Sequence, residues 1–345
     1  MLKNGFKIYL LVADGKGDEV VEGVQVLDIG LESSRLNNFL KNGSKINKLV
    51  QKINPILVHF HDPELMFVGK QLHCKFKIPV VFDIHENIAV QILDKEYIPK
   101  PFRGIVSYFY RKVENYFLKY FHLVIAEHSY ENVYTNKGES LTTVLNMPDL
   151  NHFKPYVNTH RSGNNVFYIG GISNERGLDI TLEALKILKS RGTDFFMHYI
   201  GPISNEKIDG LALGEIKQDI KFYGRMDSKV GFEISKKCVV GLSVLKPIKN
   251  YVGSYSTKIF EYMAIGLPVI TSNFPLYQNV VERYNCGYCV NPYSSEELAD
   301  KIEELISNTE LTNQMGMNGQ LAVKEKFSWS SEEEKLLGLY KDILV

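Results

Sequence analysis

Apolar and polar positions alternate in blocks along the whole chain. Short apolar or β-branched runs are separated by longer amphipathic stretches, a pattern typical of parallel strands joined by crossover helices. The predicted strands form a first series at 6–13, 56–60, 80–84 and 123–127, and a second at 165–170, 195–201, 220–224, 239–245 and 267–272. We therefore expect an α/β fold with two doubly wound parallel sheets, one in each of two domains that face a cleft.

The segment 144–165 separates the two series and is typical of an interdomain connection, because it is polar and contains Pro148, Pro155 and Gly163. We place the boundary near residue 150, with one domain over 1–150 and the other over 151–327. Residues 328–345 offer a serine N-cap followed by glutamates, which predicts a terminal helix. We expect this helix to cross back to the first domain.

The beginning of the chain predicts an incomplete first domain. Residues 1–5 resemble the end of a helix with Gly5 at its C′ position, and a strand follows directly. In a doubly wound domain the first strand is central and its loop approaches the ligand. We expect that a first strand and its helix are missing before Met1; the alternative is a domain that simply starts differently.

Composition narrows the class of partners. The 345 residues exceed what one core supports, and 40 Lys plus Arg balance 40 Asp plus Glu, so no overall charge favours nucleic acid. No apolar run reaches the length of about 20 residues that spans a bilayer, and residues 1–13 lack a cleavage site, so we expect a cytoplasmic protein. The cysteines are too few for a disulfide framework, and the CGYC segment at 286–289 leads into a strand end, so no redox or metal role is expected there.

The segment 254–272 predicts an anion site at the start of a helix. Small hydroxyl residues precede an apolar helical run, so backbone N–H groups of the first turn are available for an anion. Together with Ser254, Ser256, Thr257 and the cation of Lys258, they suit the oxygens of a diphosphate. Plain helix capping is the alternative for the hydroxyl residues.

A carboxylate and a glycine pair extend this prediction. Glu261 lies one turn into the helix, where its two acceptor oxygens fit a ribose diol. Gly170 and Gly171 end a predicted strand and allow close backbone approach, and Arg176 follows at the next helix start, where it could bind phosphate and offset a leaving diphosphate. Both candidate phosphate sites lie at carboxyl ends of strands in one predicted sheet, where open α/β domains bind ligands.

Two strands of the first series end in polar clusters, at 58–64 and 82–88. His85 and Glu86 directly follow a buried strand, so they are candidates for orienting a sugar or an acceptor hydroxyl. His61 and Asp62 form the neighbouring acceptor-side pair. A histidine with a purely structural role is the alternative in each cluster.

Residues 95–121 interleave six Lys or Arg with nine aromatic residues. Such a segment could lie on an anionic membrane surface. A core helix with a basic outer face has the same composition, so both interpretations stay open.

At these residues the chain resembles the retaining, GT-B-fold glycosyltransferases of family 4, a group that acts in bacterial surface-polysaccharide synthesis such as that of O-antigen or capsule. The resemblance covers essentially the whole chain and is carried by five segments: HFHDPEL, FDIHE, GGISNERG, STKIFEYMAIGLPVITS and the closing FSWSSEEEKLLGLY. It implies two Rossmann-like domains, a nucleotide-diphosphate sugar donor, with uridine the expected base, and a glycan or polyprenyl-linked acceptor.

The resemblance also implies roles for single residues. Arg176 and Lys258 would contact the donor diphosphate, Glu261 the ribose and His85 the transferred sugar, while the backbone near Gly224 and Arg225 would meet the base.

The chain departs from the family at two positions. The family commonly has a second glutamate where this chain has Gly253, and many members have an arginine at the position of Gly171. A retaining reaction of this type needs no protein nucleophile, and we expect neither a metal nor another cofactor at the leaving diphosphate. A non-catalytic nucleotide-sugar-binding scaffold and a GT-B-like UDP-sugar epimerase are the alternatives.

Overall fold

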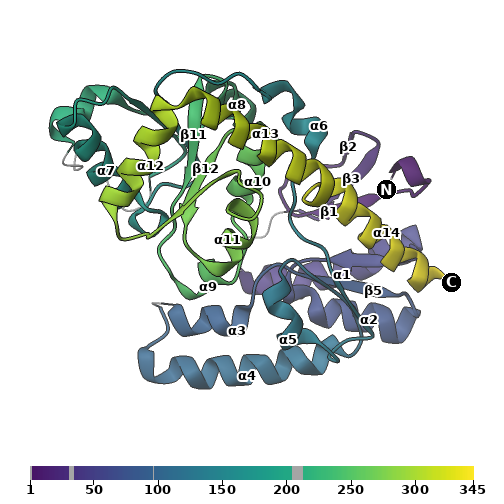
Figure 1. The fold of residues 1–345 in the computed structure, drawn as a ribbon. Helices are drawn as coiled ribbons and strands as arrows, with labels where there is room; N and C mark the ends of the chain where they lie inside the picture. The colour runs from purple at the N-terminus through teal and green to yellow at the C-terminus, as the bar shows by residue number, and fades with distance from the viewer. Residues whose placement is uncertain (1, 31–34, 96, 204–212) are drawn as a thin grey trace. The chain divides into compact units, whose positions relative to one another are not determined.

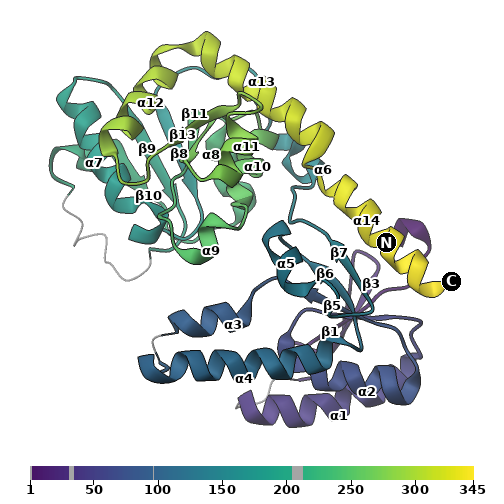
Figure 2. The same ribbon diagram turned by 60° about the horizontal axis from the view of Figure 1, so that its bottom comes forward.

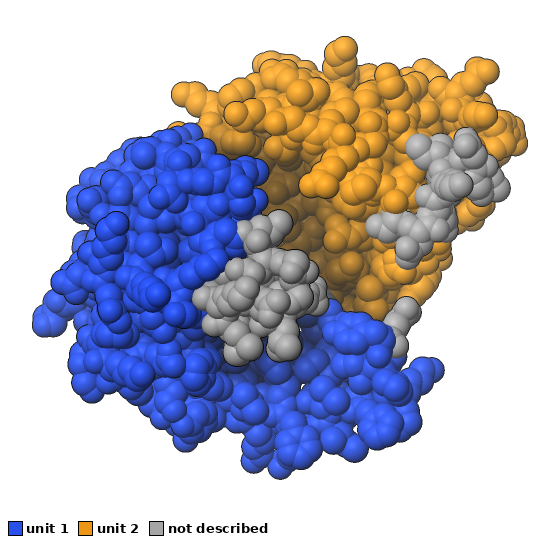
Figure 3. Space-filling model, turned by 180° about the vertical axis from the view of Figure 1, so that it is seen from behind, with its two compact units in different colours: residues 1–145, 333–345 blue, residues 146–332 orange. Residues whose placement is uncertain are grey.

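The computed structural model describes residues 2–30, 35–95, 97–203 and 213–345. The chain forms two compact units, which Figure 3 colours separately. Unit 1 comprises residues 1–145 and 333–345, and unit 2 comprises residues 146–332. The predicted connection 144–165 is not wholly irregular, because it contains the short helix α6 (Leu150–Phe153) and the 3-10 turn η5 (Lys154–Tyr156).

Unit 2 is built on one parallel sheet of six strands in the order β10-β9-β8-β11-β12-β13. The strands are β8 (Asn165–Ile169), β9 (Phe196–Ile200), β10 (Ile220–Phe222), β11 (Cys238–Ser243), β12 (Val269–Ser272) and β13 (Gly287–Val290). Chain order reverses between β8 and β11, which makes this pair the switch point of the sheet. Every residue of β11 and β12 is buried, as expected for strands covered on both faces.

Helices cover both faces of this sheet (Figures 1 and 2). They are α7 (Leu178–Ser190), α8 (Ser228–Ser235), α9 (Lys249–Val252), α10 (Thr257–Ala264), α11 (Pro275–Val281), α12 (Ser295–Ser307) and α13 (Thr309–Lys326), with 3-10 turns η6 (Asn174–Arg176) and η8 (Gly214–Asp219). The helices α7 and α12 pack together on the core side formed by Val240 and Leu242 of β11. Between them in sequence, Gly241 faces the Tyr262 ring of α10, so α10 lies on the other face.

Arg161, in the predicted connection 144–165, donates hydrogen bonds that hold this segment against the rest of unit 2. Its side chain is only 1% exposed and carries four hydrogen bonds to backbone carbonyls. Nε donates to Gly266 (2.6 Å), Nη1 to Ser235 and Cys238 (2.7 and 2.6 Å), and Nη2 to Ile265 (2.7 Å). Burial lowers the pKa of this guanidinium to about 10. Four carbonyls therefore satisfy a buried cation.

Unit 1 contains two sheets. A parallel sheet has the order β4-β5-β6-β7, and a smaller one the order β1-β3-β2, in which β3 is parallel to β1 and antiparallel to β2. The strands are β1 (Tyr9–Val12), β2 (Glu19–Val21), β3 (Val24–Asp28), β4 (Val58–Phe60), β5 (Val80–Ile84), β6 (His122–Ile125) and β7 (Ser140–Thr143). Residues of β1 and β4 line one cavity of about 470 Å³, and neither strand has a second sheet partner among the described residues.

The helices of unit 1 are α1 (Arg35–Ile53), α2 (Met66–Phe76), α3 (Ile88–Gln91), α4 (Lys100–Leu118) and α5 (Glu131–Tyr134), and α14 (Trp329–Leu344) enters the unit at residue 333. Its 3-10 turns are η1 (Leu2–Asn4), η2 (Pro63–Leu65), η3 (Ile92–Asp94) and η4 (His128–Tyr130). Gly5 ends η1 with a positive φ of 83° and donates its N–H to Leu2, as the helix-end pattern predicts. None of the helices in the described ranges has the length and apolar character needed to cross a bilayer.

Candidate functional site

The candidate phosphate-binding residues of unit 2 lie at the switch point of its sheet. The glycine pair Gly170–Gly171 follows β8, and the segment after β11 leads through α9 into α10. Loops after the two strands of a switch point diverge and leave a crevice at the carboxyl edge of the sheet. The fold therefore brings the two predicted anion sites to the same edge.

Gly170 is a position at which these elements approach closely. Its φ of 130° suits glycine, and its N–H donates to the carbonyl of Ile200 at 2.8 Å. A Cβ atom there would lie 2.7 Å from Lys258 Cε, 3.2 Å from Lys258 Nζ and 3.9 Å from an Arg176 guanidinium nitrogen. The absent side chain is thus what lets two cations converge over the turn.

Lys258 is buried, and its environment disfavours its charge. Burial, followed by the charge of Arg176, lowers the pKa of Lys258 to about 8, against a smaller opposing effect of Glu261. Its Nζ also lies 5.5 Å from the centre of the Tyr168 ring. A cation with a lowered pKa gains from an incoming anion, so the site is suited to phosphate.

The start of α10 is not capped by its own side chains. Ser256 occupies the N-cap position, yet its hydroxyl forms its hydrogen bond with Ser243 Oγ (2.9 Å) rather than with the helix N–H groups. Thr257 is exposed, and Ser254 accepts a hydrogen bond from the Tyr277 hydroxyl through its carbonyl (3.1 Å). The capping alternative is therefore not seen for Ser256, and the first N–H groups of the helix stay available for an anion.

Glu261 lies one turn further along α10 and is half-buried. Burial raises its pKa, while the charge of Lys258 acts in the opposite direction. The Glu261 carboxylate is therefore near enough to Lys258 for their charges to interact.

Gly224 and Arg225 follow β10 at the same edge. Gly224 has a φ of 69° and accepts a hydrogen bond from Gly201 N–H at 2.9 Å. A Cβ on Gly201 would lie 1.9 Å from the Gly170 carbonyl oxygen. The turns after β8, β9 and β10 therefore lie directly beside one another. Arg225 is exposed.

In unit 1, the candidate histidines gather around a residue that the sequence analysis did not select. The register of β4 on β5 pairs His59 with Val81 and Phe60 with Phe82, so the next pair along is His61 beside Asp83. His85 follows two residues after Asp83, on the same side of the strand.

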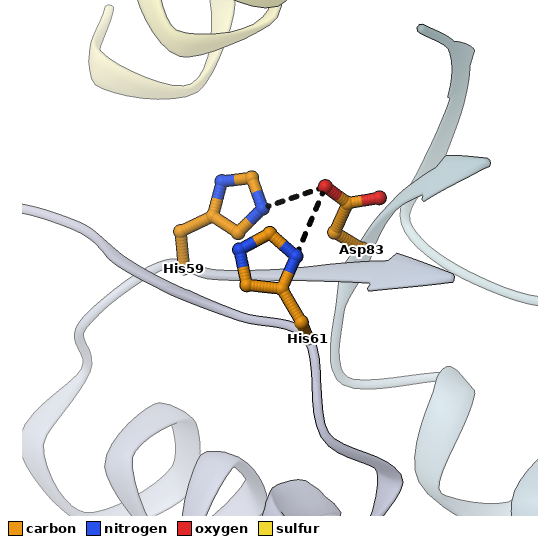
Figure 4. A group of neighbouring side chains, drawn as sticks. All are labelled: His59, His61 and Asp83. Atoms are coloured by element: carbon orange, nitrogen blue, oxygen red, sulfur yellow. Dashed lines mark ion pairs between the residues drawn. The ribbon is translucent and has the colours of Figure 1, made fainter. Parts of the chain in front are cut away.

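One carboxylate oxygen, Asp83 Oδ2, lies at the centre of this cluster. It is 3.4 Å from His59 Nε2, 3.3 Å from His61 Nδ1 and 3.3 Å from His85 Nε2, and the nitrogens of His61 and His85 are 3.1 Å apart. Figure 4 shows His59, His61 and Asp83 pointing toward one another. Burial acts to raise the pKa of Asp83, but the three imidazoles beside its carboxylate hold it far below its usual range. The same contact raises the pKa of His85.

The cluster is supported from α14 and opens into a cavity. His59 Nδ1 lies 2.5 Å from the hydroxyl of Tyr340, a buried side chain of the terminal helix. A cavity of about 380 Å³ adjoins the cluster. Its lining includes the four predicted residues His61, Asp62, His85 and Glu86, together with Pro63, Phe82, Ile84, Ile88, Tyr110 and Glu114.

The sequence analysis missed Asp83, His59 and Tyr340. A signal for the first two was present, since His59 and His61 are two residues apart, as are Asp83 and His85, in adjacent strands. Period-two spacing puts each pair on one side of its strand. Tyr340 carried no such signal, because it is 281 residues away from His59 in the chain.

Taken together, these features define a two-unit α/β protein with a phosphate-suited edge at the switch point of its second sheet. Comparison with known proteins identifies the family. The family model described as glycosyl transferases group 1 matches residues 154–322, and the model described as glycosyltransferase family 4 matches residues 1–132. The chain belongs to these glycosyltransferases and has the GT-B fold. The resemblance and the fold class inferred from the sequence are thereby confirmed.

Relatives of known name are distant. An alpha-D-kanosaminyltransferase of Streptomyces kanamyceticus is 26% identical over 182 residues, which is 52% of this chain and 45% of that protein. The capsular polysaccharide biosynthesis glycosyltransferase CapM of Staphylococcus aureus is 26% identical over 190 residues, or 51% and 46% of the two chains. The chain spans about half the length of the curated relatives it matches.

A crystal structure of Anabaena HepE in complex with UDP shares the fold. Its TM-score is 0.70 at 16% identity, with 98% of this chain and 100% of that chain covered.

Proposed function

We propose that the protein is a retaining glycosyltransferase that moves a sugar from a UDP-sugar to a glycan or polyprenyl-linked acceptor in surface-polysaccharide synthesis. The observation that carries the proposal is the convergence of Lys258 and Arg176 on the Gly170 turn at the switch point. UDP bound in HepE and the capsular role named for CapM support the choice of donor and pathway class.

Each group at the carboxyl edge of the sheet then has a role in donor binding. Lys258 and Arg176 bind the diphosphate with the backbone of Gly170 and Gly171 and with the uncapped start of α10. Glu261 accepts hydrogen bonds from the ribose diol. The remaining donor contacts come from Ser254, Ser256 and Thr257 near the phosphates and from the backbone of Gly224 and Arg225 near the base.

Leaving-group stabilisation supplies most of the catalysis in this mechanism. The bond between the sugar C1 and the diphosphate oxygen breaks, the acceptor oxygen forms a bond to C1 on the same face, and its proton passes to the departing phosphate. The two cations and the helix N–H groups offset the charge that develops on the leaving oxygen. No metal or other cofactor is assigned to this step.

We assign the acceptor side to unit 1. His85, held by the Asp83 carboxylate, and Glu86 orient the transferred sugar or the acceptor hydroxyl, while His61 and Asp62 contact the acceptor. The cavity that these residues line combines a few polar side chains with apolar walls, as small-molecule sites commonly do.

We also propose that α4 contacts an anionic membrane surface. Its outer side carries large apolar residues three or four positions apart, including Phe102, Ile105, Phe109 and Val113, each more than half exposed. Its opposite side is anchored in unit 1 by the buried Glu114, to which the Tyr134 hydroxyl of α5 donates a hydrogen bond of 3.3 Å. An exposed apolar stripe flanked by lysines is suited to an interfacial helix. A cytoplasmic enzyme at the inner face of the plasma membrane would fit this contact.

Calorimetric titration with UDP, GDP and their sugar conjugates tests the donor site. We expect one-site binding of a uridine nucleotide, and a loss of affinity of about 10- to 100-fold in Arg176→Ala, because a charge-assisted contact is removed. Glu261→Ala should also weaken binding, through the ribose. Arg191→Ala is the matched control, since Arg191 pairs with Asp300 and Glu303 on the surface of unit 2. A folded protein that binds none of these nucleotides would overturn the donor assignment.

Activity assays separate the proposed transferase from its two alternatives. Transfer of labelled sugar to a lipid-linked or glycan acceptor, with the anomeric configuration kept, is the expected result. Tight donor binding without transfer or donor hydrolysis identifies a scaffold protein instead. Interconversion of UDP-sugars without any acceptor identifies an epimerase.

Liposome flotation tests the membrane contact. We expect binding to phosphatidylcholine vesicles that contain phosphatidylglycerol, weaker binding without it, and loss of binding in the double variant Phe102→Ser, Phe109→Ser. Phe67→Ser is the control, because Phe67 is similarly exposed (51%) on α2. Equal flotation of the double variant and the control would contradict the assignment to α4.

A further inference from the structure

We infer that His59, His61 and Asp83 form a binding site for a divalent metal ion of the zinc class, with His85 beside it. The donor atoms are two imidazole nitrogens and one carboxylate oxygen, a set preferred by zinc and by neighbouring transition metals. The ligand atoms of His59, His61 and Asp83 all lie within 4.8 Å of one another, and His85 Nε2 lies within 3.3 Å of Asp83 Oδ2 and of the His61 nitrogen.

The spacing around Asp83 Oδ2 suits a tetrahedral metal centre with three protein ligands and one open position. With metal–nitrogen bonds of about 2.0–2.1 Å, neighbouring ligand atoms of a tetrahedron are separated by about 3.3–3.4 Å. Asp83 Oδ2 is 3.4 Å from His59 Nε2 and 3.3 Å from His61 Nδ1. His85 Nε2, 3.1 Å from the His61 nitrogen, lies beside this group.

Two buried polar atoms of the cluster have no hydrogen-bond partner. A carboxylate oxygen has two lone pairs, yet three rings approach Asp83 Oδ2 while Asp83 Oδ1 is buried without a hydrogen-bond partner. His59 Nε2 is likewise buried and without a hydrogen bond. A cation at the point shared by the three rings accounts for both features, because buried polar atoms in native proteins are nearly always satisfied.

Tyr340 supplies the outer support that metal-bound histidines have. The second ring nitrogen of such a histidine is usually hydrogen-bonded, which fixes the tautomer and the ring orientation. His59 Nδ1 has this contact with the Tyr340 hydroxyl, so Nε2 is directed toward Asp83. Tyr340 is therefore a positioning residue, while the three ligands come from β4, β5 and the residue that follows β4.

The test is a titration of EDTA-treated full-length protein with Zn²⁺, followed by calorimetry, and with Co²⁺, followed by its visible d–d absorption. We expect one ion per chain and the intense absorption of tetrahedral cobalt. His61→Gln, at an exposed side chain, should weaken binding by on the order of 100-fold or more, and Tyr340→Phe by about 10-fold or more. Asp83→Asn should remove the tetrahedral cobalt spectrum.

His122→Gln is the matched control, because His122 pairs with a carboxylate elsewhere in unit 1, 3.0 Å from Glu139. Absence of one-site binding in the wild-type protein would overturn the inference. So would unchanged zinc affinity in a folded His61→Gln protein, or a loss of binding in His122→Gln as large as in His61→Gln. Nucleotide titrations run in EDTA stay separate from this result, so failure of the donor site and failure of the metal site can be told apart.

Discussion

The two polar clusters of the molecule occupy equivalent places in their sheets but have opposite charge balance. In unit 2, Lys258 and Arg176 converge at the carboxyl end of β8, and the pKa of Lys258 is lowered. In unit 1, Asp83 at the carboxyl end of β5 has three imidazoles around it, and its pKa is lowered because its charge is favoured. The cluster of unit 2 consists of two cations without a bound anion. The cluster of unit 1 has a carboxylate oxygen that is approached by more imidazole rings than it has lone pairs. The comparison shows that similar strand-end positions can be prepared for ligands of opposite sign.

Removing the cation of unit 2 should have the largest effect. Lys258→Met keeps the length of the side chain and removes its charge, so we expect UDP affinity to fall by about 100-fold, or about 3 kcal/mol. The free protein should be as stable as wild type or more so, because a buried cation with a lowered pKa destabilises the fold below its ordinary pKa. Calorimetry and thermal unfolding check the two parts. Lys189→Met, at a lysine paired with Asp219, should change neither, and a destabilised Lys258→Met would contradict the charge balance described here.

Filling the Gly170 turn should have the next largest effect. Gly170→Ala adds a Cβ 2.7 Å from Lys258 Cε at a φ of 130°, so we expect a loss of stability of about 1–3 kcal/mol and roughly tenfold weaker UDP binding. Gly171→Ala is the neighbouring control, since its Cβ would meet nothing closer than 3.8 Å. Similar UDP affinities of the two variants would show that the close approach of Lys258 to Gly170 does not control UDP binding.

Raising the pH should weaken nucleotide binding through Lys258. Its pKa in the free protein is about 8, and a bound diphosphate raises it, so protonated Lys258 binds better. Affinity should therefore be constant from pH 7 to about 8 and then fall by up to about tenfold per pH unit, until the pKa of the bound state is reached. UDP titrations at several pH values check this, and Lys258→Met should show no such fall.

Removing the charge of the Asp83 carboxylate in unit 1 should have the smallest effect. It should lower the stability of the free protein, whereas Lys258→Met should leave the stability unchanged or raise it. Asp83→Asn removes the charge that the imidazoles share, so in metal-free buffer we expect a loss of about 1–2 kcal/mol in the free energy of unfolding. Urea unfolding measures it. Asp62→Asn, at an exposed carboxylate of the same cavity, should be neutral. If Asp83→Asn were more stable than the wild type, the charge balance of the two clusters would not differ as described.

The fold was predictable where strands are buried. The run 80–84 was predicted as a strand and is β5, because both faces of a parallel sheet demand an apolar sequence. The strands β2, β3 and β7 were not predicted. All three residues of β2 are exposed, β3 has a single buried residue, and β7 consists of Ser140–Thr143, so none has a buried apolar run to detect.

Positions in the candidate site were predictable where a local pattern marks them: Gly170 and His85 directly follow the end of a strand, and Lys258 lies in the first turn of α10. Asp83 was not, because it lies inside a strand and its importance depends on the register between β4 and β5. Tyr340 depends on packing of the terminal helix, which no local pattern encodes.

Arg161 has a consequence for the order of folding. The carbonyls that it bonds lie between 74 and 105 residues away in the chain, beyond α8 and at the end of α10. Its guanidinium can be buried at low cost only after those elements have come together, since contacts this distant in sequence require the closure of long loops. We therefore expect the hydrogen bonds of Arg161 to form late in folding. Their main kinetic effect should then be to slow the unfolding of unit 2 rather than to speed its assembly.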